Sequence, residues 1–317
     1  IGARGGELTL QRIALIDNAA PLFTIEHGST VRVRDSTVVG AAASEQQILG
    51  KLQARSVEIS NCSFLGAGVL QIADAMNVTI LATTFDRAGV QLAFSGLEDV
   101  PVAVAVRNCT FANAKNLRSL VVDTAVVFMT IAIEHSTFVR NSPMALSVAS
   151  SKLDLRIVGC LFQNNSCDGY SAAAMDIDVY RRPDSRPVGD SVVLISQTVF
   201  RRNVAVGVAG GIRLVAQSAF VPLTGRIVDC EFDANVGLDA GAMSFSGESM
   251  FLTRNIFRNN VGLMAAGAVV VLGDLEAVDT LCEGNNATAN NGGCIALYGV
   301  GDFTNVSATD AFPCLFP

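Results

Sequence analysis

Short segments in which apolar and polar residues alternate recur along the whole chain. They are rich in β-branched side chains, as in VEIS (57–60), VAVAV (102–106), TIAIE (130–134) and LDLRIV (153–158). A period of two with this composition is typical of a β-strand with one buried face. The repeated segments show no helical period, so the pattern predicts an all-β protein.

Each alternating segment precedes an apolar residue, here called the anchor, and this arrangement repeats at a nearly constant interval. The anchors are Leu15, Val38, Phe64, Phe85, Phe111, Phe138, Phe162, Phe200, Phe232, Phe257 and Cys282. Their spacing averages just under 27 residues, and the longer intervals follow Phe162. A unit this short contains two or three strands and cannot bury its own apolar face, so successive units must stack.

Three further columns of the repeat indicate how the coils stack. Three residues before the anchor lies a mostly polar residue, such as Asp35 or His135, which predicts a corner with left-handed backbone angles. Two before the anchor lies a small Ser, Thr or Cys. Three after it, the later copies carry Asn141, Asn165, Asn203, Asn235, Asn260 and Asn285. We expect the Phe rings to fill the core and the Asn amides to hydrogen-bond along their column.

These columns predict a right-handed, single-stranded parallel β-helix of about eleven coils. Equivalent strands would pair in parallel about 4.8 Å apart. Residues 1–317 would form one continuous domain with an inserted loop at about 166–190, as part of a longer extracellular chain. A leucine-rich repeat is disfavoured because its L-x-x-L-x-L-x-x-N frame is missing, and a propeller because its blades need about 40 residues.

The motif F-x-x-N, followed by G-[GA]-[AIMV], resembles the repeats of chlamydial polymorphic outer-membrane proteins, within the pectin-lyase-like β-helix class. It occurs as FVRN (138–141), FQNN (162–165), FRRN (200–203), FDAN (232–235) and FRNN (257–260), with GGI at 210, GAM at 241, GAV at 267 and GGCI at 292. The resemblance covers residues 138–300 and is weak before them, where Ala replaces the Asn at positions 41, 67, 88 and 114. It implies a β-helix displayed on a surface, often in an adhesive role.

Composition and charge narrow the class of protein. Charges such as Asp123 and Glu276 interrupt the longest apolar runs, so we predict no membrane insertion by this segment. The net charge is −7 without a basic run, which argues against a nucleic-acid partner. Eight Cys and six N-x-S/T sequons predict a secreted, extracellular or cell-surface glycoprotein. The sequon asparagines are Asn61, Asn77, Asn108, Asn164, Asn286 and Asn305.

The cysteines divide into a column and a set of disulfide candidates. Four cysteines, Cys62, Cys109, Cys160 and Cys230, occupy the column two before the anchor. The first two would lie two coils apart, about 9.6 Å, which is too far for a bond between them, so they are expected to act as small buried hydrophobes. We expect one bond between Cys160 and Cys167 and one among Cys282, Cys294 and Cys314. No C-x-x-C occurs, so we expect no zinc site.

The chain contains no motif of a known hydrolase, and no catalytic residue is assigned. Its two histidines lie outside any nucleophile motif, and His135 fits a structural corner position. The best candidate for a binding site is the expected loop, where Asp176 and Asp178 alternate and would face the same way. The pair could contact calcium or a glycan, with Tyr170 and Tyr180 stacking on sugar rings. The simpler interpretation is a solvated loop whose acids are balanced by Arg181, Arg182 and Arg186.

The sequence therefore predicts a non-catalytic structural or adhesive glycoprotein, a rigid rod section of a cell-surface or filament assembly. Its partners would be other copies of itself, other extracellular matrix or filament proteins, or glycans. We expect no cofactor beyond covalent N-glycans, with Ca²⁺ as the alternative at the acidic pair. Two other functions stay open: a polysaccharide-active lyase or hydrolase, and a glycan-binding module.

Overall fold

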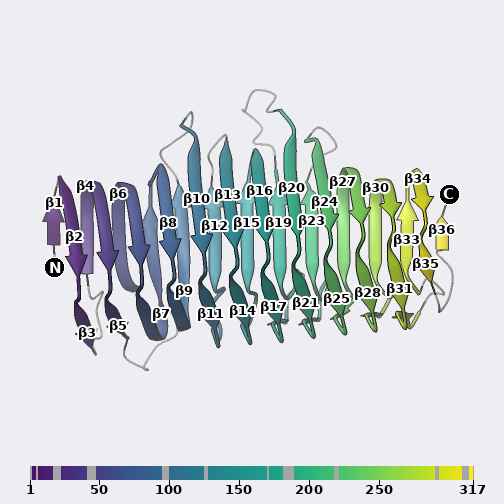
Figure 1. Ribbon diagram of the computed structural model, residues 1–317, viewed down its shortest axis with the longest axis horizontal. Coiled ribbons are helices and arrows are strands. Elements are labelled where there is room, and N and C mark those ends of the chain that lie inside the picture. The colour runs from purple at the N-terminus through teal and green to yellow at the C-terminus, as the bar shows by residue number, and fades with distance from the viewer. Residues whose placement is uncertain are drawn as a thin grey trace.

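The computed structural model describes residues 2–4, 6–16, 23–40, 48–94, 100–124, 128–169, 171–180, 189–217, 221–289, 293–308 and 314–316. Within these ranges the chain forms strands and turns and contains no helix. All strand pairings are parallel, in one large sheet and one small sheet. The strands stack along one long axis, with β1 and β36 at opposite ends (Figure 1). The predicted all-β parallel β-helix is confirmed.

Each coil begins with the alternating segment noted in the sequence, here called the upstream strand. Its buried positions alternate with half-buried or exposed ones, as in β13. The upstream strands are β2 (Glu7–Gln11), β4 (Phe23–Arg34), β6 (Ile48–Ser60), β8 (Asn77–Leu81), β10 (Val102–Arg107), β13 (Met129–Glu134), β16 (Leu153–Val158), β20 (Ser191–Ser196), β24 (Leu223–Val228), β27 (Met243–Thr253), β30 (Val269–Val278) and β34 (Gly301–Thr304).

The anchor lies at the centre of a short second strand, here called the anchor strand. These strands are β3 (Ala14–Ile16), β5 (Thr37–Val39), β7 (Ser63–Ala73), β9 (Thr84–Phe94), β11 (Thr110–Ala112), β14 (Thr137–Val139), β17 (Leu161–Gln163), β21 (Val199–Arg201), β25 (Glu231–Asp233), β28 (Ile256–Arg258), β31 (Leu281–Glu283) and β35 (Ser307–Ala308). In β7 and β9, which are longer, the anchor lies near the start.

A third, downstream strand completes the coil. In four coils it is the first part of β4, β6, β27 or β30, and in two it is the second part of β7 or β9. The separate downstream strands are β1 (Gly2–Arg4), β12 (Leu120–Thr124), β15 (Leu146–Ser150), β19 (Met175–Val179), β23 (Ile212–Ala216), β33 (Ile295–Tyr298) and β36 (Cys314–Phe316).

The small sheet lies between the anchor and downstream strands in five coils. It consists of β18 (Ser166–Cys167), β22 (Val204–Ala205), β26 (Val236–Gly237), β29 (Val261–Gly262) and β32 (Asn286–Ala287). The expected inserted loop at 166–190 is therefore too long. Its first part contains β18 and β19, which pair in register with β22 and β23, and the extra residues of this interval lie between β19 and β20.

The anchors lie in one file, as predicted. Each of the eleven pairs with the next in strand register, from Leu15 with Val38 to Phe257 with Cys282. Ala308 pairs with Cys282 and extends the file by a position that the sequence did not reveal. From Phe64 to Phe257 the neighbouring rings stack, with centroids 4.6–5.0 Å apart. Stacked aromatic pairs contribute about 0.5–1.5 kcal/mol each beyond their burial.

The predicted corner column has left-handed backbone angles in every coil that the structure describes. Its φ values lie between 45° at Ala82 and 63° at Gly159. A Cβ on Gly159 would lie only 2.6 Å from Nδ1 of His135, so a larger residue here would require this imidazole to move. A second left-handed column, which the sequence did not reveal, lies two residues after each anchor from Phe85 to Cys282, with φ between 52° and 63°.

Candidate functional site

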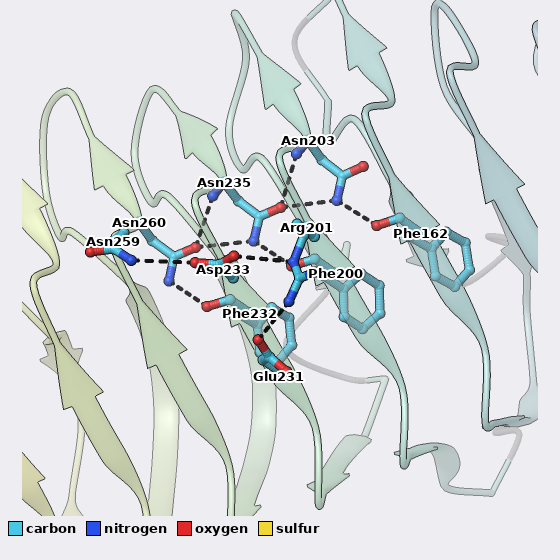
Figure 2. Close-up of polar contacts among 10 residues, drawn as sticks. All are labelled: Phe162, Phe200, Arg201, Asn203, Glu231, Phe232, Asp233, Asn235, Asn259 and Asn260. Atoms are coloured by element: carbon cyan, nitrogen blue, oxygen red, sulfur yellow. Dashed lines mark hydrogen bonds and ion pairs between the residues drawn. The ribbon is translucent and has the colours of Figure 1, made fainter.

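The buried asparagine column is a continuous hydrogen-bonded ladder between coils (Figure 2). Nδ2 of Asn203 donates to Oδ1 of Asn235 at 2.9 Å and to the carbonyl oxygen of Phe162 at 3.0 Å. Oδ1 of Asn235 also accepts the backbone N–H of Asn203 at 3.0 Å. Both Nδ2 hydrogens of Asn203 and the amide oxygen of Asn235 therefore have hydrogen-bond partners in the buried interior.

The same arrangement holds along the whole column. Side-chain amides donate to the next asparagine at 2.9–3.0 Å from Asn141 to Asn285, and each amide also donates to the carbonyl oxygen of the anchor in the preceding coil. The six side chains are at most 6% exposed. A buried polar group without a partner costs about 1–3 kcal/mol, so each amide fixes its neighbours in register.

The small residue two before the anchor makes a second inter-coil contact. Ser136 Oγ accepts the backbone N–H of Cys109 in the preceding coil at 3.1 Å and donates to the carbonyl oxygen of Glu134 at 2.9 Å. Cys109 Sγ donates in the same way to the carbonyl oxygen of Arg107. Asn255 occupies this column in a later coil, where it accepts from the backbone of Cys230 and donates to Ile227. This column therefore favours small or amide side chains that can hydrogen-bond to backbone groups at the corner.

The four cysteines of this column are buried free thiols, which their spacing predicted only for Cys62 and Cys109. Burial raises the pKa of Cys109 and of Cys160 to about 11, and that of Cys230 to about 12. Burial also raises the pKa of Cys62. Since the thiolate is the reactive form, these side chains act as inert core residues.

Ion pairs connect neighbouring coils on the outer surface. Arg201 contacts Glu231 through Nη2 at 3.0 Å and Asp233 through Nε at 3.1 Å (Figure 2). In the corner column, Nε of Arg254 lies 2.7 Å from Oδ1 of Asp229 in the preceding coil. Exposed pairs of this kind contribute at most about 1 kcal/mol, so they supplement the buried ladders.

The two carboxylates proposed as a binding pair do lie side by side on β19, but an arginine occupies the space between them. Nη1 of Arg213, on the adjacent strand β23, lies 2.6 Å from Oδ1 of Asp176 and 2.9 Å from Oδ1 of Asp178. Ser171 Oγ also hydrogen-bonds to Asp176. One guanidinium thus balances one of the two negative charges and holds the pair in an inter-coil contact.

Electrostatics at this cluster follow from its partial burial. Desolvation, followed by the charge of Asp176, raises the pKa of Asp178, while Arg213 opposes the shift. Tyr180 is half-buried directly after β19, with its backbone N–H bonded to the carbonyl oxygen of Ser150. Tyr170 lies outside the described residues, as do Arg181, Arg182 and Arg186. The geometry therefore assigns the acidic pair a contact with Arg213 and leaves glycan or calcium binding there as a prediction.

Of the expected disulfides, the structure contains one. Cys282 and Cys294 are bonded, in agreement with the bond expected among the three last cysteines. The expected bond between Cys160 and Cys167 is wrong, because both are free. Cys160 points into the corner column, where Sγ contacts the carbonyl oxygens of Ile133 and Val158. Cys167 belongs to β18 and packs in a separate cluster with Met144, Ala173 and Ala205.

All six sequon asparagines are exposed. Three of them, Asn61, Asn108 and Asn305, share the left-handed corner column. Asn77 begins β8, Asn164 occupies the second left-handed column and Asn286 begins β32. Exposure makes each a sterically possible glycosylation site.

Across the ranges that the structure describes, no three His, Cys, Asp or Glu side chains gather closely enough to hold a metal ion. The same part of the chain has no helix with the length and hydrophobicity needed to cross a membrane.

Arg213 is the main residue of the candidate site that the sequence did not reveal. It pairs in register with Asp176, 37 residues earlier, close to the interval of 38 residues between Phe162 and Phe200. Counting from one anchor to the next would have placed Leu214 beside Asp176, one residue out of register, so the anchor spacing gave no direct signal for Arg213. We compared the chain with models of protein families, with curated proteins and with solved structures, and no match was found.

Proposed function

We propose that the chain is a rigid, non-catalytic rod section of an extracellular structural or adhesive glycoprotein, built as a right-handed β-helix of about eleven coils. The observation that carries the proposal is the unbroken buried amide ladder from Asn141 to Asn285. Together with the stacked rings, it connects every coil of that section to the next. Such an arrangement resists bending and local opening, which a scaffold requires.

The surface supports the same function. The acidic pair Asp176 and Asp178 contacts Arg213, and the corner thiols are buried with raised pKa values. The exposed sequons favour display outside the cell, as does the resemblance to chlamydial surface repeats. The proposed partners are other copies of this chain or other matrix and filament proteins.

Imaging of the native assembly tests this proposal. Antibodies against the chain, used in immuno-electron microscopy of the source cells, should label an extracellular or cell-surface structure. Label confined to the cell interior would overturn the proposal. In solution, small-angle scattering should give an elongated particle, since the file from Leu15 to Ala308 spans eleven strand steps, or roughly 53 Å at about 4.8 Å each.

The enzymatic alternative is tested in parallel. It depends on Asp176 and Asp178 acting on a glycosidic bond. Incubation of the purified chain with polyuronides and sulfated glycans, with and without calcium, should give no new reducing ends or unsaturated products. Turnover that is lost in Asp178→Asn would establish the enzyme and refute the non-catalytic proposal. Glycan affinity without turnover would instead favour a binding module.

A further inference from the structure

The small sheet carries an exposed apolar strip, which we define by Val204, Val206, Val236, Leu238, Val261 and Leu263. Val206 is 67% exposed, Val204 47% and Leu263 42%, and the other three are half-buried. Most other strand residues of this size that are apolar face the core. An exposed apolar surface of this kind marks a contact site.

The side chains face outward in two rows, and the second row is out of register at Val206. In the first row Val204 pairs with Val236, and Val236 with Val261. The second row follows two residues later: Leu263 N–H donates to Gly237, which places Leu263 beside Leu238, whereas Leu238 N–H donates to Gly207, so Val206 lies out of register with Leu238. The intervening residues, such as Ala205, are buried, so the two rows point outward together.

Both ends of the strip meet a sequon in strand register. Ser166, the hydroxyl residue of the Asn164 sequon, pairs with Val204. At the other end Asn286 pairs with Val261, so this acceptor lies one strand step beyond the first row. Thr288 Oγ1, the hydroxyl of the Asn286 sequon, donates to the carbonyl oxygen of Leu263 at 2.8 Å. A sugar chain on Asn286 would leave the surface beside the strip.

The size of the strip selects among occupants. Three strands about 4.8 Å apart and three residues of about 3.3 Å each give a footprint of roughly 14 by 10 Å. That is roughly 140 Å², far below the about 800 Å² per partner that a stable protein interface buries. It is the scale of a few pyranose rings, whose faces of C–H groups can cover apolar side chains.

We propose that the first sugars of an N-linked glycan on Asn286 pack over the apolar strip and cover it. The inference rests on the proposed function, because it requires passage through the secretory pathway. It adds a defined role for one sequon: the glycan replaces the protein side chains that would otherwise have to bury Val206 and Leu263. The strip and its acceptor then form one surface unit, and the small sheet needs no protein partner.

The test uses the full chain secreted from eukaryotic cells. Asn286→Gln removes the covering glycan, and Asn77→Gln removes a glycan from β8, in a different sheet, as the matched control. Glycopeptide mass spectrometry should find Asn286 occupied in the unaltered chain. Binding of a hydrophobic fluorescent dye should rise several-fold in Asn286→Gln and stay unchanged in Asn77→Gln. Adding Leu263→Thr and Val206→Thr to Asn286→Gln should return dye binding to the starting level.

Three results would overturn the inference. They are an unoccupied Asn286 on a chain whose other sequons carry sugar, equal dye binding in the two single variants, and a dimer of the glycosylated chain that Leu263→Thr dissociates. The last would make the strip a contact between copies. Failure of the proposed function looks different, since a chain that does not enter the secretory pathway of its source cells carries no sugar there at any sequon, including Asn77.

Discussion

Removal of one amide from the middle of the buried ladder should destabilise the rod far more than loss of a surface amide. In Asn235→Ala, two donors of the preceding coil lose their acceptor: the backbone N–H and one Nδ2 hydrogen of Asn203. The carbonyl oxygen of Phe200 and Oδ1 of Asn260 each lose one donor, although Asn260 keeps the backbone N–H of residue 235.

The expected cost follows from these atoms. Two orphaned buried donors at about 1–3 kcal/mol each give a loss of roughly 2–6 kcal/mol in the free energy of unfolding. Asn259→Gly is the matched control. It removes one exposed contact with Asp233 and keeps a residue that tolerates the local φ of 53°, so it should cost at most about 1 kcal/mol.

Two measurements check the difference. Urea unfolding followed by circular dichroism gives the change in midpoint. Native-state hydrogen exchange reports the amide of Asn203, which should lose protection in Asn235→Ala and keep it in Asn259→Gly. Equal midpoints and unchanged protection at Asn203 would refute the claim that the ladder fixes the coils in register.

Three further predictions concern the thiols, the disulfide and the acidic pair that contacts Arg213. Because burial raises the pKa of Cys109 to about 11, alkylation of this thiol at pH 8 should require unfolding of the chain. The stability that the neutral thiol contributes should decline as pH rises from about 9 to about 11. Rapid labelling of Cys109 in the folded chain, read by mass spectrometry, would contradict this prediction. Reduction of the bond between Cys282 and Cys294, which closes 12 residues, should lower the stability of the folded state by about 3 kcal/mol, and an unchanged melting temperature in reductant would refute it. Arg213→Met should raise the pKa of Asp178 further, because the carboxylate loses its cation. The loss of stability relative to the unaltered chain should therefore be small near pH 4 and grow toward pH 7. A loss that does not depend on pH, or an Asp178 titration that NMR finds unchanged, would exclude the ion pair.

The columns that could be predicted from sequence are those in which one residue type repeats. Phe stacks on Phe and Asn hydrogen-bonds to Asn, so the same contact requires the same residue type in each coil. The left-handed column two after the anchor escaped notice because it accepts Arg, Asn, Ala and Gly alike. The strands of the small sheet have two residues each, too few for a period of two to be recognised.

The errors at the candidate site have a common physical origin. Cys160 and Cys167 are close in sequence, yet β17 separates them and they face different clusters. Asp176 and Arg213 are far apart in sequence, yet they are direct neighbours in register. In a stacked coil, residues separated by one whole coil of sequence are neighbours in space. The insertion after β19 lengthens this coil, so the number of residues in it could not be read from the average spacing.

The repeated ladder contacts make the coils interchangeable. Deletion of residues 204–235 would place Asn260 directly after the coil of Asn203, with the same donors and acceptors at the new junction. Length can therefore change by whole turns while the internal chemistry stays constant, so unequal recombination offers such a chain a ready route to longer or shorter versions of itself.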